Sequence, residues 1–382
     1  MKIIIASDSY KGSCSSIEVA NAIEKGIREV YDDAEIIKIP VADGGEGTVD
    51  ALVNSTGGRY EEIQVLNPLG HQITAKYGVI HDEFAVIEMA SASGITLINQ
   101  NELNPLITTT YGTGELIKDA MEKGLRKILV GLGGSSTNDG GVGMAQALGF
   151  SFKDKSGKEI SFGGGELAEI KEIDSANVHP LLKDTEIIAM SDVDNPLYGP
   201  TGAAYIFGPQ KGADKYMVTK LDENLQHYAK LLKNFSNKDI SNIPGSGAAG
   251  GLGAGLIAFC NASIEPGISK ILDITGIDSY LIDADLVITG EGRIDGQSVF
   301  GKVPVGIAKR SGKYNVPVIA IVGSIGEGVA EVYSHGIDAI IDIINKPMTL
   351  EYAMANAEEL ITKSASNAMR MYKMQDRTFI NL

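Results

Sequence analysis

Cysteine and histidine are scarce in this chain. Its 382 residues include two cysteines and five histidines. Cys14 and Cys260 form no spaced motif, which argues against a disulfide framework and fits a reducing compartment. The histidines show none of the spacing typical of zinc ligands. We therefore expect a protein without structural disulfides and without a zinc centre.

Basic residues are few compared with acidic ones. The chain has 33 lysines and arginines against 49 aspartates and glutamates, a formal net charge of −16. Such an excess of negative charge disfavours nucleic acid and anionic membrane as partners, so we expect neither. An anionic substrate would have to be held by a few well-placed cations and backbone N–H groups.

Long apolar runs are also lacking. The least charged stretch, residues 248–262, is shorter than the ~20 apolar residues of a membrane span, and glycines and Asn261 interrupt it. The first residues do not have the pattern of a signal peptide. The hydrophobic content of 43% is nevertheless ample for a core. We therefore expect a cytoplasmic protein, and at this length two domains.

Strand and helix patterns alternate at both ends of the chain. Short apolar runs, each followed by a loop and an amphipathic stretch, occupy residues 3–53 and recur from residue 285 onward. Ser15 and Glu18 have the spacing of a helix capping box. Between these ends, three strand-like runs follow one another directly from residue 60 to residue 89, which indicates an antiparallel portion.

This order of patterns predicts an α/β protein with two α/β domains. One is a doubly wound parallel sheet that is discontinuous in sequence. The other is mixed, with an antiparallel portion, and is inserted into the first. The expected boundaries are residues 1–75 with 285–382 for the first domain, and 76–284 for the second.

A glycine-rich stretch at residues 131–143 connects an apolar strand-like run to a helix-like pattern. Six of its 13 residues are glycine, and most of the others carry a hydroxyl or amide group. Glycine permits a close approach of backbone to ligand, and successive N–H groups that end at a helix N-terminus form an anion site. The alternative is an ordinary strand-to-helix connection, but those usually run about 2–6 residues. We interpret the stretch as a phosphate-binding loop.

Two further glycine motifs match known fingerprints imperfectly. Residues 296–302 match the first seven positions of a P-loop, but Val303 stands where a serine or threonine should bind magnesium. Pro304 suits the start of a helix, so Lys302 can still face an anion at a helix N-terminus. Residues 245–250 match the dinucleotide fingerprint, but no strand pattern precedes them. Close helix packing explains these glycines better, with an anion at the helix start as the alternative.

Carboxylates and cations lie among these loops. Asp192 and Asp194 follow an apolar run with i, i+2 spacing, so both can face the same side and offer Mg²⁺ hard oxygen ligands. The alternative is an Asx-turn before Asn195. Four basic residues lie inside glycine-rich loops of this acidic chain, which favours an anion-binding role: Lys11, Lys211, Arg293 and Lys302.

Six motifs in order along the chain resemble those of the type I bacterial glycerate kinases. They are Ser7-Asp-Ser-Tyr-Lys11-Gly12, Pro40-Val-Ala-Asp43-Gly-Gly-Glu-Gly-Thr48, Gly133-Gly-Ser-Ser-Thr-Asn138-Asp139-Gly-Gly, Asp192-Val-Asp-Asn-Pro-Leu197, Phe207-Gly-Pro-Gln-Lys211-Gly212 and Thr289-Gly-Glu-Gly-Arg293-Ile-Asp295. Tyr10, Ser136 and Ser191 depart from the usual family residues, but none of these departures removes a charge. The resemblance covers nearly the whole chain.

The resemblance implies transfer of phosphate from ATP to D-glycerate, with 2-phosphoglycerate as the expected product, in glyoxylate or aldarate catabolism. It also implies two α/β domains, one of them flavodoxin-like. It leaves open which loop binds which ligand, which residue is the general base, and the oligomeric state.

From the residues and the resemblance together we predict a site that uses ATP and Mg²⁺. The expected cofactor-binding residues are Gly133, Gly134, Ser135, Ser136, Thr137, Asn138, Lys211 and Lys302. The expected catalytic residues are Lys11, Asp43, Asp192, Arg293 and Asp295. The expected Mg²⁺ ligands are Asp192 and Asp194. The resemblance implies that Asp192 is the principal ligand, because the family varies more at position 194 than at position 192. Asp43 is expected to contact the glycerate hydroxyl, and Arg293 its carboxylate.

Two other classes of function remain as alternatives. Residues 245–250 leave open a nucleotide-cofactor-dependent oxidoreductase of a small hydroxy acid, and the two-domain pattern leaves open a ligand-binding protein without activity. Only a kinase would release ADP when incubated with ATP, Mg²⁺ and glycerate.

Overall fold

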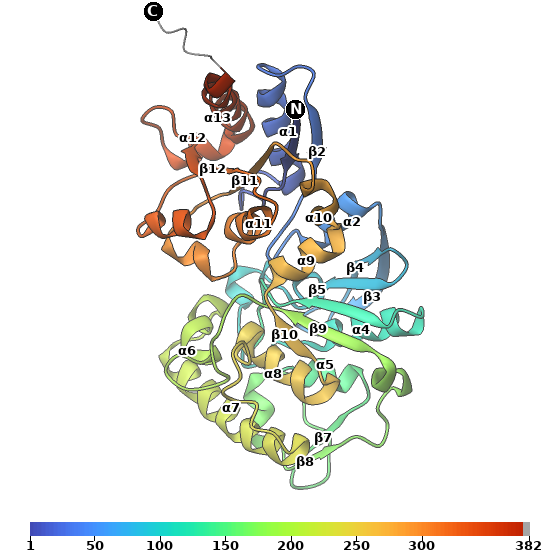
Figure 1. Ribbon diagram of the computed structural model, residues 1–382. Helices are drawn as coiled ribbons and strands as arrows, with labels where there is room; N and C mark the ends of the chain where they lie inside the picture. The colour runs from blue at the N-terminus through green and yellow to red at the C-terminus, as the bar shows by residue number, and fades with distance from the viewer. Residues whose placement is uncertain (377–382) are drawn as a thin grey trace, which may run out of the picture. The chain divides into compact units, whose positions relative to one another are not determined.

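The computed structural model describes residues 1–376 and shows two compact units (Figure 1). The first contains Met1–Asp43, Asp50–Thr56 and the chain from Gly267 onward, and the second contains Gly44–Val49 and Gly57–Pro266. These limits differ from the expected boundaries at residues 75 and 285. Residues 57–75 lie in the second unit because the strand at Arg59–Leu66 pairs along its length with the next strand, Gln72–Ile80.

The first unit is built on a five-stranded sheet in which every neighbouring pair is parallel. Its strands are β1 (Lys2–Ile5), β2 (Glu35–Lys38), β11 (Leu286–Glu291), β12 (Val318–Val322) and β13 (Ala339–Asp342). Their spatial order is β13-β12-β11-β1-β2. Counted along the chain within the unit, this is the flavodoxin-like order 2-1-3-4-5. The expectation of a flavodoxin-like parallel sheet is therefore confirmed.

Helices cover both faces of this sheet. The unit's helices are α1 (Ser16–Arg28), α9 (Gly267–Thr275), α10 (Ile277–Leu281), α11 (Val303–Gly312), α12 (Leu350–Ala355) and α13 (Ala357–Tyr372). Helices α1 and α13 lie side by side (Figure 1) and share a core with alternate strand residues such as Ile3 and Ile288. The intervening residues, such as Ile4 and Val287, are buried on the other face, and α11 contacts β11 and β12.

Local sequence signals explain how α1 is placed. The capping box forms as expected, with the Glu18 amide donating to Ser15 Oγ at 3.3 Å and the Ser15 amide donating to Glu18 Oε2 at 2.8 Å. At Gly26 a Cβ atom would lie 2.3 Å from the Thr362 oxygen. Glycine there lets α1 pack closely against α13.

The second unit contains a six-stranded mixed sheet. Its strands are β3 (Arg59–Leu66), β4 (Gln72–Ile80), β5 (Phe84–Glu88), β6 (Lys127–Gly131), β9 (Glu186–Met190) and β10 (Ser263–Glu265). The strand order is β10-β9-β6-β5-β4-β3. Strands β10, β9, β6 and β5 are parallel to one another, whereas β4 is antiparallel to both of its neighbours, β5 and β3. The antiparallel portion is therefore confirmed. Strands β7 (Ser151–Lys153) and β8 (Glu172–Asp174) form a separate antiparallel pair.

Helices of the second unit are α3 (Ala90–Ser93), α4 (Tyr111–Glu122), α5 (Val142–Ala147), α6 (Ala203–Phe207), α7 (Lys215–Ser236) and α8 (Ala248–Cys260), while α2 (Thr48–Thr56) spans the division between the units. Short 3-10 helices occupy Ile95–Leu97, Gln100–Glu102, Gly164–Glu169, Pro180–Asp184, Pro209–Lys211, Gly296–Phe300, Val329–His335 and Lys373–Asp376. In residues 1–376, none of the helices combines the length and the apolar character that crossing a membrane requires.

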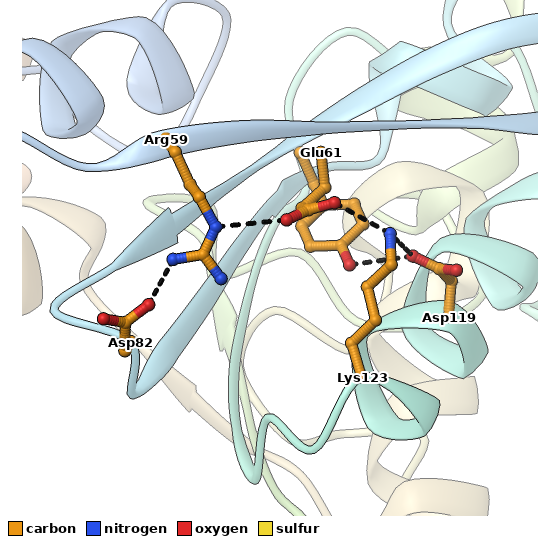
Figure 2. Close-up of polar contacts among 6 residues, drawn as sticks. Arg59, Glu61, Asp82, Asp119 and Lys123 are labelled. Atoms are coloured by element: carbon orange, nitrogen blue, oxygen red, sulfur yellow. Dashed lines mark hydrogen bonds and ion pairs between the residues drawn. The ribbon is translucent and has the colours of Figure 1, made fainter.

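An ion-pair network joins α4 to the antiparallel strands of the second unit (Figure 2). Lys123 Nζ lies 2.9 Å from both Glu61 Oε2 of β3 and Asp119 Oδ2 of α4. The Tyr77 hydroxyl of β4 donates to the same Asp119 oxygen at 2.8 Å. Arg59 extends the network by pairing with Glu61 and with Asp82. The network links side chains of β3, β4 and α4, beyond the hydrogen bonds of the sheet.

Candidate active site

The glycine-rich stretch begins at the carboxyl end of β6, in the middle of the second unit's sheet. Gly134, Gly140 and Gly141 have φ angles of +74°, +64° and +77°, which side-chain-bearing residues rarely adopt. At Gly133, a Cβ atom would lie 2.9 Å from the Gly45 Cα atom. The glycine-rich stretch and the glycines that follow Asp43 therefore pack backbone against backbone.

Lys211 braces the glycine-rich stretch from within the protein. Its side chain is 1% exposed, and its Nζ atom donates to Ser135 Oγ and to the Thr137 main-chain oxygen, both at 2.7 Å. Burial lowers the pKa of Lys211 to about 7, and the neighbouring charge of Asp139 opposes that shift. The lysine that we expected to contact ATP thus has its ammonium group enclosed and directed at the loop.

Asp139 occupies the start of the helix that follows. Its carboxylate accepts hydrogen bonds from the amides of Gly141 (3.1 Å) and Gly143 (3.2 Å). It also accepts from the amide and hydroxyl of Thr110 at 2.8 and 2.9 Å. Burial raises its pKa, and these hydrogen bonds act in the opposite direction. A protein carboxylate thus takes the position where the sequence predicted an external anion, and α5 has only six residues.

Three polar atoms of the loop have no hydrogen-bond partner. They are Thr137 Oγ1 and both side-chain amide atoms of Asn138, in two residues with no exposed surface. Ser136 differs, because its hydroxyl donates to the main-chain oxygen of Ser93 at 3.0 Å. Buried polar groups are nearly always paired in native proteins, and an unpaired group calls for a functional or solvent-related explanation. Thr137 and Asn138 are therefore the loop residues with unused hydrogen-bonding capacity.

The glycines of residues 245–250 serve close packing. No strand precedes them, because the element before them is α7, and residues 248–250 already belong to α8. A Cβ atom at Gly250 would lie 2.0 Å from the main-chain oxygen of Thr137, and one at Gly247 would lie 2.2 Å from the main-chain oxygen of Pro196. The motif therefore lacks the strand-turn-helix context of a dinucleotide site, and the close-packing interpretation is confirmed.

Asp192 and Asp194 follow β9, which is adjacent to β6 in the sheet. Asp192 is half-buried and Asp194 is exposed. The Asn195 side-chain amide donates to the Thr201 oxygen at 2.8 Å, which fixes the next turn. Across the described residues 1–376, no group of three or more histidine, cysteine or acidic side chains is arranged to hold a metal ion. A cation at these aspartates would need further ligands from a substrate or from water.

The remaining predicted site residues lie in the first unit. Lys11 is exposed in the turn after β1, and Asp43 is half-buried after β2. Arg293 is exposed, and its Nε atom lies 3.5 Å from Asp295 Oδ2. Asp295 caps the 3-10 helix Gly296–Phe300 by accepting from the Gln297 amide at 3.0 Å. Arg293 and Asp295 are thus brought together, with the guanidinium group open to solvent.

Residues 296–302 do not form a P-loop. They include a 3-10 helix, which is separated from β11, and Gly301 with a φ of +115°. Lys302 is the N-cap residue of α11, and Pro304 is its second residue rather than its first. Lys302 Nζ lies 3.6 Å from Glu291 Oε2. The helix start predicted for Lys302 is present, and its ammonium group faces a carboxylate of the protein.

Two carboxylates that were not among the predicted site residues lie where the strand order reverses. Asp8 follows β1 and Glu291 ends β11, and the Asp8 amide donates to the Gly290 oxygen at 3.0 Å. Burial, reinforced by the charge of Asp43, raises the pKa of Asp8 to about 8. Burial raises the pKa of Glu291 to about 7 against the opposing charge of Lys302. Their position directly after apolar strand patterns was a usable signal in the sequence.

Comparison with known proteins gives one consistent answer. The model of the glycerate kinase family matches residues 3–373. The glycerate 2-kinase of Escherichia coli K12 is 48% identical over 368 residues, covering 96% of this chain and 97% of that protein. The glycerate kinase of Bacillus cereus is 50% identical over 375 residues and covers 98% of both chains.

A solved structure agrees over the same extent. The crystal structure of the putative glycerate kinase 2 from Salmonella typhimurium LT2 has a TM-score of 0.88 and 46% identity, and it covers 99% of this chain and 100% of that one. The family match over nearly the whole length and these identities show that the chain belongs to the glycerate kinase family.

Proposed function

We propose that this protein transfers the γ-phosphoryl group of ATP to D-glycerate and releases 2-phosphoglycerate and ADP, as a type I member of its family. Membership of the glycerate kinase family supports the reaction class and the phosphate donor. The absence of a strand before residues 245–250 removes the observation that favoured an oxidoreductase. The name of the E. coli relative, glycerate 2-kinase, favours the 2-phosphorylated product.

The observation that carries this proposal within the fold is the braced loop after β6. Phosphoryl transfer depends mainly on positioning and charge stabilisation. In an α/β sheet, ligands bind beyond the carboxyl ends of the strands, where this loop lies. Gly133 is half-buried and Gly134 is exposed, so a ligand can approach the backbone at these two residues, and Lys211 fixes Ser135 and Thr137 from behind. We assign the ATP phosphates to the backbone of residues 133–138, with the Asn138 side chain as a further contact.

Asp192 and Asp194 fit Mg²⁺ as a pair of hard oxygen donors. Because no third side-chain ligand is grouped with them in residues 1–376, the phosphates of ATP and water would complete the coordination. The bound ion would neutralise charge on the phosphates during transfer. Asp192, the more buried of the two, is the principal ligand in this assignment.

The first unit supplies groups suited to a small hydroxy acid. The exposed guanidinium of Arg293 can pair with the glycerate carboxylate through two hydrogen bonds, and Asp295 orients it. Lys11 and Lys302 add positive charge near the strand ends of an otherwise acidic chain. Asp43 remains the residue assigned to the glycerate hydroxyl.

The test is a coupled assay for ADP with ATP, Mg²⁺ and D-glycerate, with L-glycerate and omission of glycerate as controls. We expect ADP only when D-glycerate is present. Phosphorus NMR of the product distinguishes the 2-phosphate from the 3-phosphate. ADP release that does not depend on glycerate would refute the assignment of substrate, and a 3-phosphate product would refute only its regiochemistry.

A further inference from the structure

The general base of the reaction is the role that the sequence leaves open. Deprotonation of the attacking hydroxyl requires a carboxylate or another base within hydrogen-bond reach, with a pKa near the working pH. Asp43, the residue assigned to this hydroxyl, follows edge strand β2. Glu291 instead ends the central strand β11, beside β1.

The position of Glu291 in the fold favours a ligand. Strands β1 and β11 are neighbours at the point where the order 2-1-3-4-5 reverses, and open α/β sheets bind ligands beyond the strand ends at this switch point. The main-chain oxygen of Glu291 accepts from the Gly323 amide at 3.1 Å. At Gly290, a Cβ atom would meet the Ile321 oxygen at 2.1 Å, so the strand is tightly held. The carboxylate therefore extends from a rigid support.

The two carboxylate oxygens of Glu291 have different partners. Ser298 Oγ donates to Oε1 at 2.8 Å, while Lys302 Nζ lies 3.6 Å from Oε2. Ser298 is itself fixed, because its hydroxyl also accepts from the Asp295 amide at 3.2 Å. The side chain of Glu291 keeps 8% of its surface exposed, which leaves a narrow approach for a substrate hydroxyl.

We propose that Glu291 is the catalytic base that accepts the proton of the glycerate hydroxyl. This inference rests on the proposed kinase function. The O–H bond breaks as its proton passes to the Glu291 carboxylate, and the hydroxyl oxygen forms a bond to the γ-phosphorus of ATP. The bond from that phosphorus to the bridging oxygen breaks, and its electron pair leaves with ADP. The proton on Glu291 then passes to water.

The charged neighbours of Glu291 set its protonation behaviour. Burial favours its protonated form, and Asp295 acts in the same direction, while Lys302 and the Ser298 hydroxyl favour the carboxylate. Asp8, which interacts with Glu291 and Asp43, keeps its proton to higher pH. Both pKa values lie near neutral pH, where a carboxylate can serve as a general base. Of the two carboxylates, Glu291 is the one placed between the Ser298 hydroxyl and the Lys302 ammonium group.

The test compares the pH dependence of kcat/KM for D-glycerate in the wild type, Glu291→Gln and Glu291→Asp between pH 5 and 9. We expect wild-type kcat/KM to rise with pH through about 7, as Glu291 ionises. Glu291→Gln should lower kcat by ~10²–10⁴-fold, the usual contribution of a general base. It should also abolish the rise of kcat/KM with pH, which is the acidic limb of the pH profile. Glu291→Asp should retain the limb at reduced activity. The KM for ATP should stay within about twofold in both variants.

Asp295→Asn separates a catalytic from a structural role. Removing the negative charge of Asp295, which favours the protonated form of Glu291, should move the pH at which kcat/KM rises to a lower value, whereas a structural role would leave it in place. Asp33→Asn, at an exposed position before β2, is the matched control and should leave the profile unchanged. An unaltered limb in folded Glu291→Gln would overturn the role of Glu291 alone. Absence of glycerate-dependent ADP formation by the wild type would instead overturn the proposed function, and this role with it.

Discussion

The Nζ atom of Lys211 lies 2.7 Å from the main-chain oxygen of Thr137, with the ammonium group enclosed by protein. A buried ammonium group is costly unless it is fully hydrogen-bonded. The loop backbone thus provides part of its solvation, and the lysine fixes the loop in return. Each partner constrains the conformation of the other.

Replacing Lys211 should therefore disturb the loop. Lys211→Met keeps most of the volume but leaves Ser135 Oγ and the Thr137 oxygen without their donor, at about 1–3 kcal/mol for each unpaired group. We expect kcat/KM for ATP to fall by at least ~10-fold and the melting temperature to drop. Lys215→Met, at an exposed position on α7, serves as the control in the same assays. Wild-type ATP kinetics in folded Lys211→Met would contradict the bracing role.

Gly134 should tolerate no side chain. Its φ of +74° disfavours any other residue, and an added Cβ would lie 3.1 Å from Ala90 Cβ. Gly157 is a matched control, because it has a φ of +79° with nothing within 4 Å of the added atom. We expect Gly134→Val to raise the KM for ATP at least ~10-fold, a loss of about 1.4 kcal/mol. Gly157→Val should cost only about 1–2 kcal/mol of stability. ATP affinity within twofold of wild type in Gly134→Val would exclude the loop as the phosphate site.

Asp192 and Asp43 should each matter for turnover. Asp192→Asn is expected to lower kcat by ~10² or more and to raise the Mg²⁺ concentration needed for half-maximal activity. Asp43→Asn should lower kcat without changing the Mg²⁺ requirement. Asp194→Asn should have a smaller effect than Asp192→Asn, and Asp184→Asn, at an exposed position, should have none. A wild-type Mg²⁺ titration for Asp192→Asn would remove this residue from the metal site.

The contribution of Asp8 to the stability of the protein should fall as pH rises from about 4 to about 8. The folded state keeps the proton of Asp8 up to a pKa of about 8, whereas the unfolded chain loses it near 3.8. The favourable contribution of Asp8 to the free energy of unfolding is therefore complete below about pH 4, and it is lost as pH rises through 8. Glu291 acts in the same direction up to about pH 7.

Asp8→Asn should consequently be more stable than the wild type at pH 8, by on the order of 2 kcal/mol, and much closer to it at pH 4. Thermal unfolding of both proteins at the two pH values measures the difference. Asp33→Asn should follow the wild type at both. If the gap between Asp8→Asn and the wild type did not widen with pH, the raised pKa of Asp8 would be refuted.

The sequence predicted the fold class because its signals are local. Alternating strand and helix patterns and the Ser15–Glu18 capping box depend on nearby residues, and all of them appear in the structure. The boundary at residue 75 was less accurate, since periodicity identifies a strand but not the sheet that it joins. Pairing of Arg59 with Val79 and of Leu66 with Gln72 assigns β3 to the second unit.

The candidate site was predictable only in part for a related reason. Glycine content identified the loop, but the contact of Lys211 with Ser135 spans 76 residues. The Asp139 carboxylate accepts hydrogen bonds at the start of α5 from the amides of Gly141 and Gly143, and the conformation of these glycines cannot be read from sequence. Asp8 and Glu291 come together only through strand order. Which residues follow strands can be read from sequence, but which strands are neighbours cannot.

The parallel sheet of the first unit is assembled from both ends of the chain, with Lys2 hydrogen-bonded to Asp285 across 283 residues. Ribosomes extend a chain at ~5–20 residues per second, so β1 emerges roughly 14–57 seconds before β11. Throughout that interval one edge of β1, with Ile3, Ile4 and Ile5, has no strand to pair with. Unpaired apolar strand edges promote aggregation. Nascent chains of this protein should therefore depend on chaperone protection until β11, which ends at Glu291, has been synthesised.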